Sequence, residues 1–180
     1  IVVHASGTED MLMISISGAA AGNGAGAGVI NTLVAKNTVR AKVDGSTLNA
    51  SGSEISYQIT AEDGKQQQIT TSSDVCVEAS DEALILDLAG GLAAGSTAGV
   101  GATVVVLVFN KTVEAALSGT VAAAGDISVT ANVEDDLYLL ALAFGAGGTA
   151  GVAGGANALV FENSTTAALG GMVVKANDVL

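Results

Sequence analysis

One sequence pattern decides the fold, and it occurs three times. It reads IVVHASGTEDMLMISIS in residues 1–17, VCVEASDEALILDLAGG in residues 75–91 and ISVTANVEDDLYLLALA in residues 127–143. Each string contains a short strand-like run, an acidic segment and a long apolar run, in the same order. Such self-similarity is typical of repeat proteins, in which each repeat buries its apolar side chains against its neighbours.

The spacing of these strings sets a register for the whole chain. The second string begins 74 residues after the first, and the third begins 52 residues after the second. The same offsets align Thr38 with Thr112 and Ser164, which lie in the related strings KNTVRA, NKTVEA and NSTTAA. Because the alignment persists far from the strings that defined it, we interpret it as the register of stacked modules.

The chain therefore divides into three repeat modules. Their boundaries are 1–74, 75–126 and 127–178. The first module is 22 residues longer than the second, and the extra residues lie within 48–70. We expect this segment to add one coil, because its length is close to that of one solenoid repeat. Val179 and Leu180 are expected to open a fourth module of a longer array.

The composition favours strands over helices. Apolar residues make up 49% of the chain, but only two tyrosines and three phenylalanines are aromatic, 24 residues are glycine and none is proline. A glycine costs about 1 kcal/mol in a helix interior, whereas β-branched and aliphatic residues pack well in sheets. The absence of proline suits strands that pair on both sides. We predict an all-β fold, a parallel β-helix (β-solenoid).

Three uncharged runs raise the alternative of membrane-spanning helices. They cover residues 11–35, 88–110 and 137–161, and each exceeds the ~20 residues that span a bilayer. Their central parts are mostly glycine, alanine, serine and threonine, which gain little from contact with lipid. We interpret each run as two apolar strands flanking a glycine-rich corner, and we expect no membrane insertion of this segment.

Charge and cysteine content exclude several partners and sites. The net charge of −12 opposes binding to a nucleic-acid backbone, and no cluster of basic residues offsets it. The single cysteine, Cys76, excludes an internal disulfide and a zinc site built from several cysteines.

No residue combination predicts catalysis or a cofactor. His4 is the only histidine, and the repeat aligns it with Glu78 and Thr130, a polar outward position in a strand. A polysaccharide lyase, which also uses a β-helix, would need a row of acidic and basic residues along one face, and the six basic residues form no such row. We therefore expect a protein that is not an enzyme.

An acidic segment recurs once in each module. We expect these segments to be solvated turns that stack along one edge of the solenoid. Converging carboxylates also suit calcium, with Asp135 and Asp136 as the best candidates, but the glycine-aspartate nonapeptide of calcium-binding β-rolls is absent. The prediction is therefore no metal site. The segments comprise Glu9 and Asp10, Asp81 and Glu82, and Glu134, Asp135 and Asp136.

The string AAAGDISVTAN in residues 122–132 resembles the repeats of filamentous-haemagglutinin-like exoproteins, a class of large repetitive bacterial adhesins and leukotoxin-like proteins. The glycine- and alanine-rich runs and the strings NKTVEA and NSTTAA are similar to that family as well. The resemblance implies a right-handed parallel β-helix, exported and displayed at the cell surface as an adhesin. The chain departs from that family in its uneven module lengths and its high glycine content.

Three sequons occur, at Asn49, Asn110 and Asn163. We expect Asn110 and Asn163 to be turn residues required by the repeat, and the resemblance adds glycosylation as the alternative for all three.

The functional expectation is structural. We expect a stalk segment of a secreted or cell-surface bacterial exoprotein, in which neighbouring repeats stack and a cell-surface receptor is the partner. The alternative is an extracellular fibre subunit that assembles with copies of itself through its strand edges.

Overall fold

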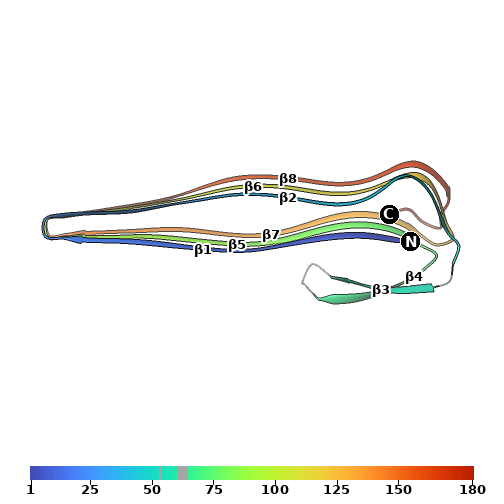
Figure 1. Cartoon of the computed structure of the whole chain (residues 1–180), viewed down its shortest axis with the longest axis horizontal. Coiled ribbons are helices and arrows are strands. Elements are labelled where there is room, and N and C mark those ends of the chain that lie inside the picture. Colours follow the sequence, from blue (N-terminus) through green and yellow to red (C-terminus); the bar gives the residue numbers. More distant parts are fainter. Residues whose placement is uncertain (53, 61–64) are drawn as a thin grey trace.

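The chain is all-β, with six long parallel strands in two sheets. The structure is a computed structural model that describes residues 1–52, 54–60 and 65–180. Figure 1 shows the two sheets lying face to face along the whole length of the molecule. One sheet has the order β1-β5-β7 and the other the order β2-β6-β8. The bounds are β1 (Val2–Ala21), β2 (Gly24–Ala50), β5 (Val75–Gly95), β6 (Ala98–Ala123), β7 (Ile127–Gly147) and β8 (Ala150–Lys175).

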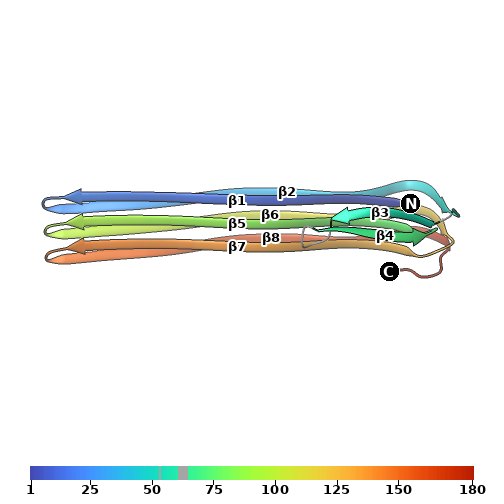
Figure 2. The ribbon, with the colours of Figure 1, turned by 90° about the horizontal axis from the view of Figure 1, so that it is seen from below.

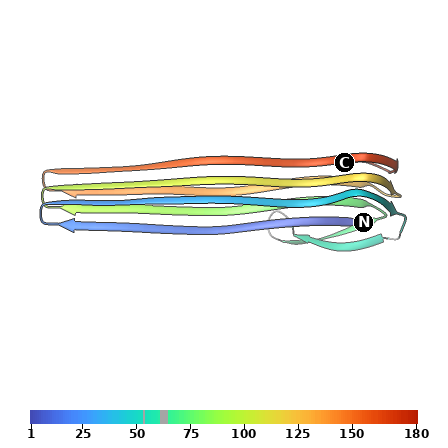
Figure 3. The same ribbon diagram turned by 45° about the horizontal axis from the view of Figure 1, so that its top comes forward.

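Each layer of the stack is one long arch of two strands. The chain runs out along β1, turns at the tip and returns along β2, and β5 with β6 and β7 with β8 repeat this path (Figure 2). The turns fall in the glycine-rich corners predicted from the sequence. They lie directly above one another, because Thr97 N donates to Asn23 O at 2.9 Å and Thr149 N to Thr97 O at 3.0 Å. Figure 3 shows the tips in line at one end of the molecule.

The strand register has the two offsets read from the sequence. Val2 pairs with Cys76 and Val75 pairs with Ile127, and both ladders run parallel. Val179 continues the pattern by pairing in parallel with Ile127 outside the long strands. The predicted all-β class and the predicted parallel stacking are therefore confirmed, and the arrangement is of β-solenoid type.

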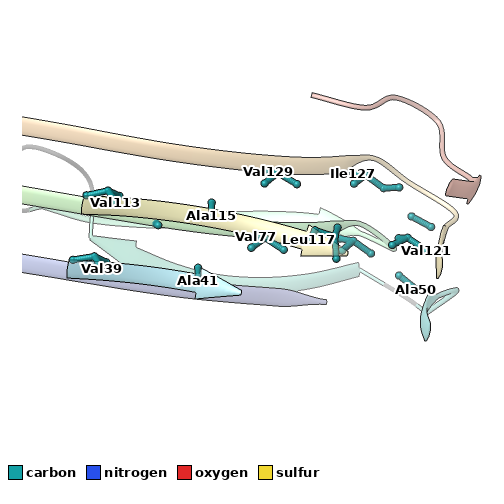
Figure 4. Close-up of a cluster of buried hydrophobic side chains, with 13 residues drawn as sticks. Val39, Ala41, Ala50, Val77, Val113, Ala115, Leu117, Val121, Ile127 and Val129 are labelled. Atoms are coloured by element: carbon teal, nitrogen blue, oxygen red, sulfur yellow. The ribbon is translucent and has the colours of Figure 1, made fainter. Parts of the chain in front are cut away.

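Every second side chain of each long strand points into the space between the two sheets, and the others point outward. Away from the tip, inward-facing valine, leucine and isoleucine form the core, and Figure 4 shows Val39, Val77 and Val113 among the side chains that meet there. Toward the tip the inward residues are small, such as Ala93 and Gly101, and the two sheets converge (Figure 1). A Cβ on Gly101 would lie 2.5 Å from Phe144 O, so only glycine fits at this approach.

The prediction of an extra coil within 48–70 is wrong. Residues up to Ala50 belong to β2, and the following segment forms an antiparallel hairpin of β3 (Glu54–Thr60) and β4 (Gln66–Ser72). This hairpin projects on the outer side of the β1-β5-β7 sheet at the end away from the tip (Figure 1). β4 runs antiparallel to β3, so these two strands pair with each other instead of adding to the parallel ladders.

The uncharged runs are strands, as predicted. Each of the three forms parts of two strands and the turn between them. In the ranges that the structure describes, no helix has the length and apolar character needed to cross a bilayer.

Candidate functional site: a buried lysine that joins three layers

A lysine lies between the two sheets about halfway along the arch. Lys111 is in β6, and its side chain is 0% exposed. Its Nζ forms ion pairs with Asp81 of β5 and Asp135 of β7, and it lies 3.8 Å from Glu9 Oε2 of β1. One ammonium group therefore contacts carboxylates from all three layers. We name Lys111, Glu9, Asp81 and Asp135 the lysine cluster.

Two further side chains complete its surroundings. Asn37 occupies the position of Lys111 in the neighbouring layer, on β2. Its Nδ2 donates to Asp81 Oδ1 at 2.6 Å and also to Glu9 Oε1. On the apolar side, Lys111 Nζ lies 5.2 Å from the centroid of the Phe109 ring, within the range of a cation–π contact. The ammonium is thus held by charge, by hydrogen-bonded carboxylates and by an aromatic ring.

Burial and charge shift the pKa of Lys111 in opposite directions. Burial lowers the pKa of Lys111, because it disfavours the ammonium, but hydrogen bonds to Asp135 and Asp81 and the charges of both outweigh burial. The net result is a pKa above the ordinary value of 10.5. Lys111 therefore stays charged inside the protein at neutral pH.

The cluster has three carboxylates and one ammonium group, and this excess of negative charge affects the pKa of Glu9. Burial raises the pKa of Glu9 from 4.5, and the charges of Asp81 and Asp135 raise it further, while Lys111 opposes them. An acid with a raised pKa in the folded state binds its proton more tightly there than in the unfolded state. Glu9 thus favours folding fully below pH 4.5, and this contribution is lost as the pH rises through the raised value.

Replacing Glu9 with glutamine is expected to stabilise the protein at pH 7.5 and to have little effect near pH 4. Glutamine resembles the protonated acid and still accepts the hydrogen bond from Asn37. We expect a gain of roughly 0.5–1 kcal/mol in the free energy of unfolding at pH 7.5, measured by urea denaturation at both pH values. The matched control is Glu134→Gln, an exposed position on the same sheet. An equal gain in the control, or a loss in Glu9→Gln at pH 7.5, would contradict this assignment.

The chemistry available to the cluster is structural. Lys111 and Asp81 are both 0% exposed, so no substrate reaches them. If the layer of β5 and β6 shifted by one residue, Lys111 would turn outward. Asp135 in the next layer would still face inward and would lose its counter-ion. The cluster therefore favours one stacking register over the neighbouring ones.

The prediction that the acidic segments are solvated turns is wrong. Glu9 and Asp10 lie inside β1, Asp81 and Glu82 inside β5, and residues 134–136 inside β7. Because neighbouring residues in a strand point to opposite faces, one acid in each segment faces inward and the next faces outward. The inward acids are the ones that bind Lys111.

The candidate calcium ligands do not converge on one site. Asp135 faces inward to Lys111, and Asp136 is exposed on the opposite face of β7. Within the described residues, no group of three or more histidine, cysteine, aspartate or glutamate side chains is arranged to hold a metal ion.

The sequons lie in strands, so the expected turns at Asn110 and Asn163 are wrong. Asn110 is half-buried on the outer side of β6, and Asn49 is exposed near the end of β2. Asn163 pairs with Lys111 across the ladder and so belongs to the inward-facing column. Glycosylation at the three sites stays a prediction, and Asn163 is exposed because β8 has a neighbouring strand on one side only.

His4 lies where the repeat alignment placed it. It pairs with Glu78, which in turn pairs with Thr130, and its Nδ1 is 3.5 Å from Glu78 Oε2.

The sequence interpretation missed the lysine cluster. Lys111 directly follows Asn110, for which the sequence predicted a turn, although it lies in an alternating run in which Leu107, Phe109 and Val113 are all inward. A charged residue at an apolar phase of such a run was the available signal. A second buried pair was missed in the same way: Asn31 Nδ2 donates to Asp87 Oδ1 at 2.6 Å.

Comparison with known proteins adds no assignment: no family model, no curated protein and no solved structure matches this chain.

Proposed function

We propose that this chain is a structural segment of a secreted or surface-displayed bacterial exoprotein, a stalk that holds an adhesive region away from the cell. In this proposal the stack is a right-handed parallel β-helix of three repeat modules. The observation that carries it is the constant register of the parallel ladders, with every layer a copy of the same arch. The resemblance of residues 122–132 to filamentous-haemagglutinin-like repeats supports an extracellular, cell-surface setting.

The burial pattern supports growth by stacking. Inward side chains of the central layer, such as Leu107 and Phe109, are 0% exposed, because a layer covers them on each side. In β8, which has a neighbour on one side only, the corresponding side chains of Leu159 and Phe161 are 49% and 41% exposed. Stability of this kind is a sum over neighbouring layers, so each added layer lengthens the stack by about 4.8 Å without changing its interior.

Adding layers is the test of the spacer role. Ten extra copies of residues 75–126, inserted after residue 126, should lengthen the stack by about 48 Å, measured on particles by negative-stain electron microscopy. The matched control replaces the hairpin of β3 and β4 with a short glycine-serine link, which should leave the stack length unchanged. Loss of the β-type circular dichroism spectrum in the extended chain would contradict modular stacking.

The adhesive part of the proposal has its own measurement. Non-adherent bacteria that display the chain are expected to bind cultured epithelial cells more than the same bacteria without it. Equal binding by the two strains would contradict the adhesive part of the proposal and would leave the spacer role as it stands.

The open core of β8 also supports a second candidate function, an extracellular fibre subunit. A second copy that stacks its β1 and β2 on β7 and β8 would cover Leu159 and Phe161 and would pair both strand edges. Electron micrographs of the unmodified chain at high concentration separate the two functions: filaments support the fibre, and discrete particles support the stalk.

A further inference from the structure

The outer side of the β1-β5-β7 sheet is apolar toward the tip. The large side chains there that are between 44% and 75% exposed include Leu12, Ile14, Ile16, Leu140, Leu142 and Phe144. They stand in matching register, because Ile14 pairs with Leu88, which pairs with Leu140. We name this surface the tip-half face. An apolar patch of this extent is a mark of an interaction site.

The tip-half face is also hollowed. Gly90 lies between Ile16 and Leu142 in the register, and its missing side chain leaves a hollow of about 190 Å³. Ile14, Leu88 and Leu140 complete the lining of this hollow. A hollow with apolar walls accepts an apolar anchor from a protein partner. The opposite outer face also exposes apolar residues, among them Ile30, Val34 and Val160, but its central strand β6 presents only valine and alanine there, and the outward residues of β8 include Ala158 and Gly154.

The unpaired strand edges argue against lipid as the occupant. The apolar stretch of about ten residues would span roughly 33 Å, close to the thickness of a bilayer core. However, β1, β2, β7 and β8 are edge strands of the two sheets. Their open sides carry tens of backbone N–H and C=O groups, which lipid cannot hydrogen-bond. A protein partner covers the face and leaves these edges in water.

The size of the face fits a second copy of the chain. Three strands spaced about 4.8 Å apart, each contributing about ten residues, give roughly 460 Å² per copy. Two copies would then bury roughly 900 Å² or somewhat more, near the lower limit for a specific interface. We propose that two copies of this chain pair through the tip-half face. This pairing uses the outer face of a sheet and not the strand edges, so it goes beyond the stalk and fibre proposals. A failure of the pairing would leave both of those proposals standing.

Charge and shape select the direction of the pair. On the same outer surface, away from the tip, the outward residues include Asp10, Glu82, Glu134 and Asp136. Two copies pointing in the same direction would bring these carboxylates together. They would also set the two hairpins against each other, because each hairpin lies on this side at the end away from the tip (Figure 1). Copies pointing in opposite directions overlap only their tip-half faces.

Sedimentation velocity of the full chain tests the pair. The chain is expected to sediment as a dimer at micromolar to 100 µM concentrations, and Leu88→Lys should raise the dissociation constant at least 100-fold. The matched control is Val106→Lys, the same change on the opposite outer face of the same layer, with an expected change below threefold. Circular dichroism confirms that both variants are folded. A monomeric chain throughout this range, or equal effects of the two variants, would overturn the proposal.

A distance measurement tests the direction. Spin labels at Ala94→Cys, with Cys76→Ser to remove the native thiol, are expected roughly 25–30 Å apart in the opposed pair and roughly 10 Å apart in a same-direction pair. Ser128 occupies the position of Cys76 in the next layer, so serine is accepted there. Flotation with phosphatidylcholine vesicles tests the lipid alternative: co-flotation that dissolves the dimer would overturn the proposal, and absence of flotation would support it.

Discussion

Replacing Lys111 with methionine is expected to lower the free energy of unfolding by about 3–5 kcal/mol. Methionine fills most of the volume but leaves Asp81, which is 0% exposed, and Asp135, which is 10% exposed, without their counter-ion. An uncompensated buried charge costs far more than an exposed ion pair contributes. Urea denaturation at pH 7.5, followed by circular dichroism, measures the loss.

The control for this variant replaces the two aspartates with the residues that occupy the same columns in neighbouring layers. Val133 pairs with Asp81 and Ala83 pairs with Asp135, so each column already accepts an apolar residue. The triple variant Lys111→Met, Asp81→Val, Asp135→Ala should recover most of the stability, because a buried ion pair is often replaceable by apolar packing. A loss below 1 kcal/mol in the single variant, or a triple variant less stable than the single one, would show that charge burial is not the cause.

Phe109→Ala is expected to cost about 3–5 kcal/mol as well, for a different reason. The Phe109 side chain is 0% exposed, and its ring centroid lies 5.7 Å from that of Phe161 in the next layer. Truncation removes its packing and leaves a cavity that the long ladders on both sides hold open. Thermal and urea unfolding of the variant measure the loss.

Phe161→Ala is the matched control, because it removes the same side chain from the same column in an edge layer. Phe161 is 41% exposed, so less apolar area is lost from the interior. We expect a cost of about 1 kcal/mol or less. Equal losses in the two variants would mean that burial between layers does not set the stability of the stack.

The repeat was predictable because stacking copies one sequence pattern into one ladder. Residues that pair in a parallel stack occupy equivalent positions in successive repeats, so the offsets between similar strings equal the strand register. The corners were predictable for a similarly local reason. Glycine-rich segments around Asn23, Thr97 and Thr149 interrupt otherwise apolar runs, and turns form there.

The length of the strands and the partners of Lys111 were not predictable from local chemistry. Acidic and asparagine-containing segments are typical of turns, and inside a strand they are tolerated only if partners satisfy them. The partners of Lys111 lie 24 or more residues away and on the other sheet. Which inward positions meet across the core depends on how the two sheets face each other, and no single segment records that.

The sequence by itself determined that this protein is all-β, that its layers stack in parallel, and with which offsets, because each of these follows from period and repetition along the chain. Only the tertiary structure decided that the extra segment is a hairpin, that a lysine joins three carboxylates, and that large apolar side chains stay outside at the tip. These features depend on contacts between the sheets: small inward residues draw the sheets together at the tip and leave the leucine, isoleucine and phenylalanine side chains no interior to occupy.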